Sequence, residues 1–302
     1  MKKKILKYVV LAVVVGNLAL VAVVFLDGKS QSRQSLPNPN GFDDFLKAGQ
    51  LVTVPRAPGQ NPSVEELRAL VAPNAEALKL VRAGLGRECR VPVSFSSEYY
   101  VDTNQVIALE CKALDMVLEG EGRLAEMEHR TNDAARIYLE AIRFSQECSR
   151  GGFKINRVVG EQCEASGLGR LRQQMGGLDA GQCRDAIKLL EIMEEKREPI
   201  ADVLARDKRW WHNHTSLGDQ MKLIPTLAKD PSLNPMNTSP EEMEKNTKDR
   251  QRQARQLIID LAVRCYELEK GARLKSTADL VPAYLNSIPQ DPFTVTNLVH
   301  GS

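Results

Sequence analysis

Residues 105–148, QVIALECKALDMVLEGEGRLAEMEHRTNDAARIYLEAIRFSQEC, decide the fold class of this chain. Apolar side chains recur in this stretch with the 3.6-residue period of an amphipathic helix, first over residues 105–128 and again over residues 132–148. Only a short polar turn separates the two runs. The stretch therefore predicts two antiparallel helices joined as a hairpin.

The same periodicity continues on the C-terminal side of this hairpin. Residues 155–174 and 180–198 are predicted to form a second hairpin, and residues 240–270 a long helix with a packing stripe in its second half. The expected fold class is all-α. We expect an irregular bundle or a short stack of helical hairpins over residues 63–275, followed by an extended, proline-containing tail over residues 276–302 that packs on the domain.

The N-terminus carries a different signal. Residues 1–7 contain four lysines, and residues 8–26 are almost entirely apolar, which as a helix is long enough to cross a bilayer. The basic cluster predicts a single-pass protein of the cytoplasmic membrane, with residues 1–7 in the cytoplasm and the bulk of the chain outside it. A cleaved signal peptide is the alternative. Residues 27–62, rich in Pro, Ser, Asn and Gln, are predicted to be a flexible linker. The alternative for residues 42–48 is a helix of one or two turns whose Phe42, Phe45 and Leu46 dock on the domain.

Composition restricts the partners. Of 302 residues, 41 are Lys or Arg and 39 are Asp or Glu, so no concentrated basic surface for nucleic acid is expected. The six cysteines would lie in an oxidising compartment, where disulfides are permitted. Cys148 and Cys163 flank one short connection and are the candidate pair; buried free thiols are the alternative.

The first hairpin carries a resemblance to a repeat family. Leu118, Gly122, Ala134, Tyr138 and Ala141 fall at the spacings of the tetratricopeptide repeat, in which small residues let two helices pack closely. The resemblance covers this hairpin alone. It implies close helix packing and a surface that binds protein.

The C-terminal tail contains a Tyr284-Leu285 pair, followed by Pro289-Gln290-Asp291-Pro292-Phe293. This order resembles the tail of type II secretion major pseudopilins, in which a helix is followed by a Tyr-Leu pair and a Pro-x-Asp-Pro-aromatic motif. The resemblance implies a role for Tyr284, Asp291 and Phe293 in partner binding. The alternative is that the apolar residues of the tail wrap back on the helical core.

The chain as a whole, with its anchor, proline-rich linker, helical hairpins and tail, is similar to a class of membrane-anchored helical proteins of planctomycete-type bacteria. That class has no assigned activity. The resemblance implies a location and a fold without a mechanism.

Few residues suggest chemistry. Glu161 and Glu164 lie three apart on a predicted helix, and His212 and His214 form a His-x-His pair; these four are the metal candidates. The alternatives are a solvated carboxylate face and aromatic core packing, in which one of the two adjacent tryptophans fills the core. The charged run over residues 194–198 is predicted to lie on the surface. No phosphate-binding loop or nucleophile elbow occurs, and no cofactor is expected.

These observations predict a membrane-anchored, extracytoplasmic module that binds or scaffolds another protein, with no catalysis evident. Two alternatives stay open. One is a secretion-system accessory that uses the pseudopilin-like tail, and the other is a metal-dependent hydrolase that uses the glutamates and histidines.

Overall fold

The computed structural model describes residues 36–54, 59, 61–94, 103–213 and 238–299. The chain divides into two compact units, Met1–Leu36 and Pro37–Ser302. The predicted membrane span at residues 8–26 lies outside the described residues. Among the described residues, no helix is both long enough and apolar enough to cross a membrane. The second unit is all-α, as predicted, and contains no strand among its described residues.

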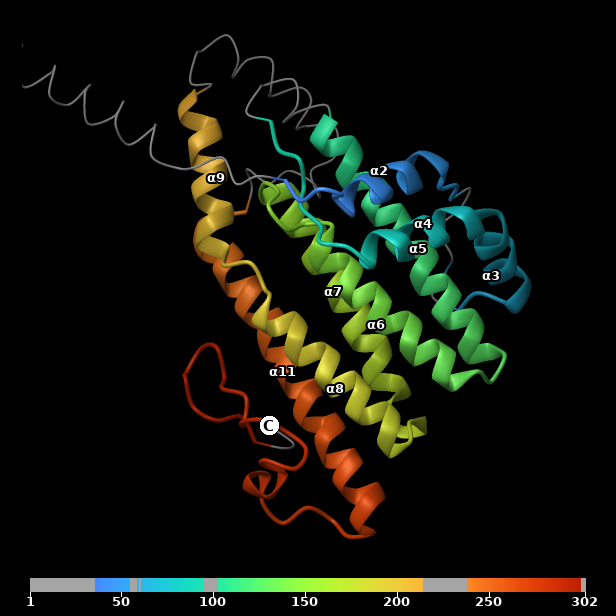
Figure 1. The fold of residues 1–302 in the computed structure, drawn as a ribbon, viewed down its shortest axis with the longest axis vertical. Coiled ribbons are helices and arrows are strands. Elements are labelled where there is room, and N and C mark those ends of the chain that lie inside the picture. Colours follow the sequence, from blue (N-terminus) through green and yellow to red (C-terminus); the bar gives the residue numbers. More distant parts are fainter. Residues whose placement is uncertain (1–35, 55–58, 60, 95–102, 214–237, 300–302) are drawn as a thin grey trace, which may run out of the picture. The chain divides into compact units, whose positions relative to one another are not determined.

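The predicted hairpin is present as α5 (Asn104–Met127) and α6 (Thr131–Glu147). A left-handed residue, His129, turns the chain between them. Gly122 lies directly against the ring of Tyr138, where any larger side chain would collide with the ring. This close approach lets the two helices pack along most of their length, beside α7 (Lys154–Gln174) (Figure 1).

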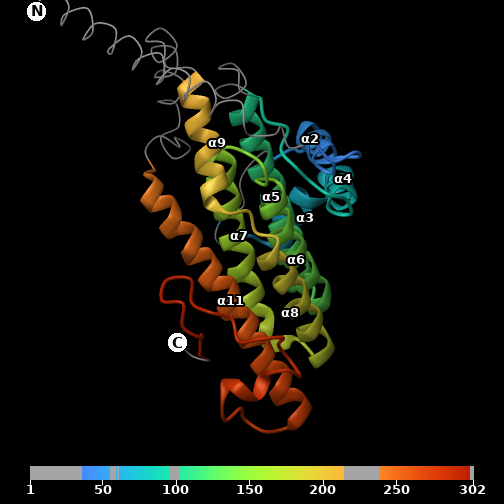
Figure 2. The ribbon, with the colours of Figure 1, turned by 60° about the vertical axis from the view of Figure 1, so that its left-hand side comes forward.

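The second predicted hairpin is not formed. Helix α8 (Ala180–Glu195) packs chiefly along α11 (Pro240–Lys270) and makes little contact with α7 (Figure 2). The reason is the apolar stripe in the second half of α11, which buries Leu257 and Leu261 against the face of α8 that carries Ala186. Because α8 and α11 are far apart in sequence, the result is an irregular bundle rather than a stack of successive hairpins.

The folded unit begins earlier than the predicted domain start at residue 63. Helix α2 (Phe42–Leu51) lies within the predicted linker, yet it packs on α4 (Ala75–Leu85) and α5. Phe42 and Phe45 are almost fully buried, and a Cβ at Gly84 would lie only 2.6 Å from the carbonyl oxygen of Gly41. The flexible-linker prediction is therefore wrong for this helix, and the alternative of a short helix docked on the domain describes it, because its apolar face is part of the core.

The remaining elements complete the unit. Helix α3 (Val64–Val71) begins with a capping box, in which Ser63 and Glu66 bind each other's backbone N–H groups, and η1 (Ala72–Asn74) joins it to α4. The short η3 (Met175–Gly177) leads from α7 toward α8. Helix α9 (Ile200–Asn213) follows α8, and its Trp210 is fully buried.

The tail begins after Gly271, whose left-handed conformation ends α11. It contains η6 (Thr277–Leu280), and its side chains Leu280, Leu285 and Leu298 are buried in the same core cluster as α8 and α11. The C-terminal segment therefore belongs to the folded unit.

All six cysteines are buried free thiols. The candidate Cys148–Cys163 disulfide is not formed, and the Cys148 thiol instead lies 3.3 Å from the carbonyl oxygen of Ser145. Cys148 belongs to the core cluster that contains α2 and α4, whereas Cys163 packs with Ile155 and Val159. The alternative prediction of buried thiols describes these residues.

Candidate functional site

Glu161 and Glu164, the two carboxylates that the sequence suggested for metal or acid–base chemistry, both lie on α7 and are buried. Glu161 accepts a hydrogen bond from Nε of Arg157 at 2.8 Å and another from the hydroxyl of Thr247 on α11. Arg157 is itself only 4% exposed. This carboxylate therefore joins α7 to α11 inside the bundle.

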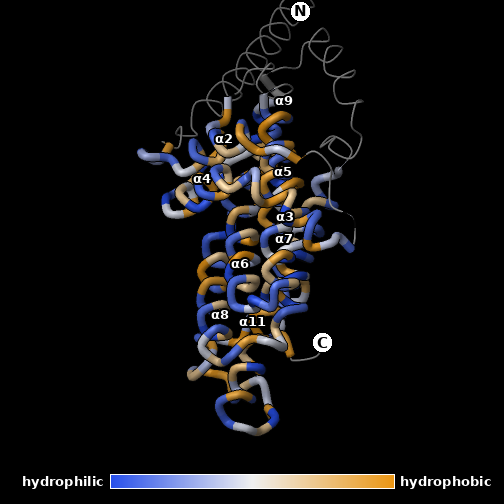
Figure 3. Tube along the Cα trace, turned by 90° about the vertical axis from the view of Figure 1, so that its right-hand side faces the viewer, coloured by the Kyte–Doolittle hydropathy of each residue, from blue (hydrophilic) through white to orange (hydrophobic). Residues whose placement is uncertain are grey.

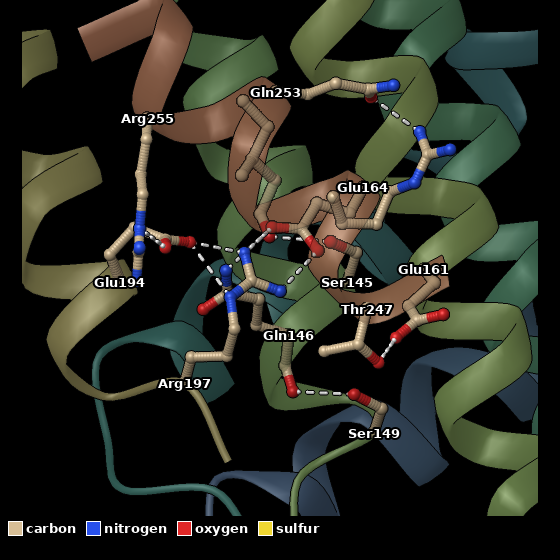
Figure 4. Close-up of polar contacts among 12 residues, drawn as sticks. Ser145, Gln146, Ser149, Glu161, Glu164, Glu194, Arg197, Thr247, Gln253 and Arg255 are labelled. Atoms are coloured by element: carbon tan, nitrogen blue, oxygen red, sulfur yellow. Dashed lines mark hydrogen bonds and ion pairs between the residues drawn. The ribbon is translucent and has the colours of Figure 1, made fainter. Parts of the chain in front are cut away.

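Glu164 belongs to a second ionic group, which we call the Arg197 cluster and which comprises Gln146, Glu164, Glu194, Arg197 and Arg255 (Figure 4). Arg197 lies in the connection after α8 and points into the bundle, where its Nη1 atom lies 2.9 Å from Glu164 Oε2. Its Nη2 atom lies 2.6 Å from Glu194 Oε1. Gln146 of α6 donates to Glu164 at 2.8 Å, and Arg255 of α11 donates to Glu194 at 3.2 Å. The cluster therefore joins four helices, and Arg197 bridges its two carboxylates.

The electrostatics of this cluster favour full ionisation. Burial raises the pKa of Glu164, but the positive charge and hydrogen bonds of Arg197 outweigh it and bring that pKa below its ordinary value. Burial also opposes the charge of Arg197, and the two carboxylates reverse this effect, so its pKa is raised. A buried carboxylate that an arginine holds in this way is costly to leave unpaired, and it is a poor metal ligand or general base.

The four metal candidates do not assemble into a site within the described part of the chain. His212 lies near the end of α9, and His214 lies outside the described residues. No group of three or more His, Cys, Asp or Glu side chains suited to a metal ion occurs among the residues that the structure describes. The two glutamates are instead paired with arginines.

A further buried acid, Asp115, lies on α5 and is 6% exposed. Burial raises its pKa from 3.8 to about 7; a hydrogen bond with the Cys163 thiol lowers the pKa in part, and the charge of Glu119 raises it. In contrast to Glu164, no arginine contributes to the pKa shift of Asp115. Asp115 is therefore expected to be largely protonated in the folded chain at mildly acidic pH.

The substitution Asp115→Asn tests this assignment. The wild-type carboxyl binds its proton more tightly in the folded chain than in the unfolded chain, so the free energy of unfolding should fall as the pH rises from about 4 to about 7. The Asn variant should lack this component. Between about pH 5 and about pH 8, urea titrations should show the wild type losing about 2–3 kcal/mol more than the variant. If the free energies of unfolding of the wild type and the Asn variant instead changed with pH in parallel, Asp115 would be ionised in the core throughout this pH range.

The three tail residues suggested for partner binding have different surroundings. Asp291 is 7% exposed, lies 3.1 Å from Nε of Arg252 and accepts the backbone N–H of Phe293 at 2.7 Å. Tyr284 packs against the ring of Tyr266, lies under Arg184 and donates to Glu269. Phe293 is 42% exposed. Asp291 and Tyr284 thus fix the tail on the bundle, and Phe293 faces solvent.

An open groove of about 560 Å³ lies along the outer face of α6. Its floor is formed by Ala135 and Leu139 of α6, with one wall from the end of α4 and the other from Leu178 and α8. Figure 3 shows α4 and α8 at different levels along α6, with the middle of α6 between them. A groove of this size can receive a few side chains of a ligand or partner. We call it the α6 groove.

The rim of the α6 groove is charged. Glu140 accepts hydrogen bonds from Nε of Arg82 at 2.8 Å and from Nη1 of Arg136 at 2.6 Å, so two arginines share this carboxylate. Arg143, one turn further along α6, is half-buried and makes no hydrogen bond or ion pair with the described residues. Asp185 lies on the α8 side and is exposed. The α4 end of the groove is therefore the more positive end.

Several of these residues were missed or misinterpreted from the sequence. The charged run over residues 194–198 was predicted to lie on the surface, but Arg197 is 3% exposed at its side chain and Glu194 is 11% exposed. The signal that could have found Asp115 is its place among the apolar residues of the α5 stripe. The groove has no such signal, because its walls come from segments about 100 residues apart.

The comparisons with known proteins add no function: no protein-family model, no curated protein and no solved structure matches this chain.

Proposed function

We propose that this chain is a membrane-anchored, extracytoplasmic module that binds another protein through the α6 groove. The observation that carries the proposal is the groove itself, an apolar floor on α6 bounded by α4 and α8 and rimmed by arginines. Interfaces commonly combine an apolar centre with a polar rim in which arginine is enriched. The predicted helix at residues 8–26 supports the membrane location.

The state of the buried acids supports binding over catalysis. Glu161 and Glu164 are ion-paired with Arg157 and Arg197, and such pairs leave neither carboxylate available for a metal or a substrate. The buried pairs also give the bundle a defined arrangement, on which a groove between distant segments depends. The module that we propose is therefore a rigid surface for recognition.

Site-specific photo-crosslinking tests this proposal. Benzoylphenylalanine would replace the exposed Asn132 at the groove, and the exposed Glu65 on α3 would be the control position. In native membranes we expect a protein adduct from position 132 and none from position 65. The full chain should stay with the membranes after alkaline extraction, whereas a chain without residues 1–26 should be released. Absence of an adduct at position 132 would contradict the proposal.

The tail supports a second candidate, a secretion-system accessory that recognises its partner through residues 291–295. Phe293 and Val295 are 42% and 69% exposed, and Val295 has a φ of 58°, which is costly for a β-branched residue. An exposed apolar side chain held in this conformation suits a contact with another protein. Benzoylphenylalanine at position 293 discriminates the two candidates, because an adduct there and none at position 132 would favour the tail.

A further inference from the structure

We infer that the partner of the α6 groove is an amphipathic helical segment of about three turns with an Asp or Glu side chain that pairs with Arg143. This inference rests on the proposed function and specifies the chemistry of the partner. It is drawn from the length of the groove, its apolar lining and Arg143, which pairs with no acidic side chain among the residues that the structure describes.

The length of the groove fits a short helix. The α6 residues that line it run from Asn132 to Arg143. At 1.5 Å per residue this stretch is about 16 Å long, which corresponds to three helical turns. Because α4 and α8 each pack against α6, they bound a strip of α6 on which Asn132 and Arg136 are exposed and Glu140 and Arg143 are half-buried. A helix can be laid along such a strip.

The apolar surface fits one face of such a helix. Leu85 at the α4 end, Leu139 in the middle and Leu189 on α8 line the groove; Leu85 and Leu139 are 5% and 9% exposed, and Leu189 is half-buried. A partner helix would meet them with apolar side chains spaced three and four residues apart.

Charge selects the partner. Arg82 and Arg136 are satisfied by Glu140, and Arg82 also pairs with Glu121, so these groups neutralise one another. Arg143 lies at the same end of the groove without an acidic partner among the described residues. A half-buried guanidinium without a carboxylate favours an acidic group on whatever covers it, and a planar two-point contact is its strongest form.

The test is a selection of displayed helical peptides on the full chain held in detergent micelles. Wild-type protein should enrich peptides with an apolar stripe of three turns and an Asp or Glu near one end. Against these peptides, Arg143→Glu should raise the Kd about tenfold or more. The control Arg68→Glu changes an exposed arginine on α3, away from the groove, and should leave the Kd unchanged. Peptides in which the acid is replaced by Lys should recover affinity for Arg143→Glu.

The possible failures are distinct. An adduct at position 132 with no acidic preference in the selected peptides would overturn the inference and leave the proposed function in place. Absence of both the adduct and the enrichment would overturn both. Self-association of the chain that Arg143→Glu abolishes would identify a second copy as the occupant and would also overturn the inference.

Discussion

Replacement of Arg197 by methionine is expected to lower the free energy of unfolding by about 3–5 kcal/mol. Within the described part of the chain, the guanidinium alone joins Glu164 to Glu194, whose side chains are 2% and 11% exposed. Methionine fills much of the same volume but supplies no donor. Glu164 would then lose its ion-pair partner inside the bundle, and Glu194 would keep only Arg255 at 3.2 Å. An uncompensated buried carboxylate is a much larger penalty than the loss of a favourable contact.

The matched control is Arg68→Met. Arg68 also pairs with a glutamate, Glu128, at 2.8 Å, but its side chain is 58% exposed. Exposed pairs contribute about 0–1 kcal/mol, so urea titrations followed by circular dichroism should separate the two variants clearly. Equal and small effects would mean that Arg197 does not lie in the bundle as described.

The pH dependence gives a second readout of the same substitution. In the wild type the lowered pKa of Glu164 contributes stability that is present above about pH 4.5, the ordinary value for glutamate, and is lost as the pH falls through the folded-state value. Arg197→Met removes the charge that lowers this pKa and leaves burial, which raises it. The variant should therefore differ most from wild type near neutral pH and least in acid. A difference that is constant with pH would point to lost packing alone.

The helices that carry a clear apolar period could be predicted closely. The hairpin predicted over residues 105–128 and 132–148 forms as Asn104–Met127 and Thr131–Glu147. Which helices pack together could not be predicted. In the sequence α8 lies between α7 and α9, yet it packs chiefly along α11, which begins only at Pro240. Periodicity indicates that one face of a helix is buried, but it does not identify the helix that covers that face.

Charged residues show the same limit. Arg197 stands in a run of acidic and basic residues that is typical of a solvated surface. Only the packing of α6, α7 and α11 around its side chain leaves that side chain 3% exposed. The α6 groove depends likewise on α4 and α8 meeting α6 from distant parts of the chain. Sites of this kind arise from tertiary structure, so local sequence carries no signal for them.

The substitution Phe45→Ala is expected to cost about 3–5 kcal/mol, although Phe45 lies in a segment whose composition is that of a linker. Its ring is 2% exposed and makes edge-to-face contacts with Phe42 at 5.9 Å and with Phe144 of α6 at 5.0 Å between centroids. Removal of the ring would leave a cavity between α2, α4 and α6 that the close approach of Gly41 and Gly84 prevents from collapsing.

The control for this prediction lies on the same helix. Leu51 is 53% exposed at the end of α2, and Leu51→Ala should change the free energy of unfolding by no more than about 0.5 kcal/mol. Urea midpoints of the two variants then decide where the folded unit begins. A large loss for Phe45→Ala alone means that α2 unfolds with the core and that the folded unit begins before residue 63. Equal small losses would make residues 42–51 part of a flexible linker, because a helix that is only loosely associated with the core loses little when its ring is removed.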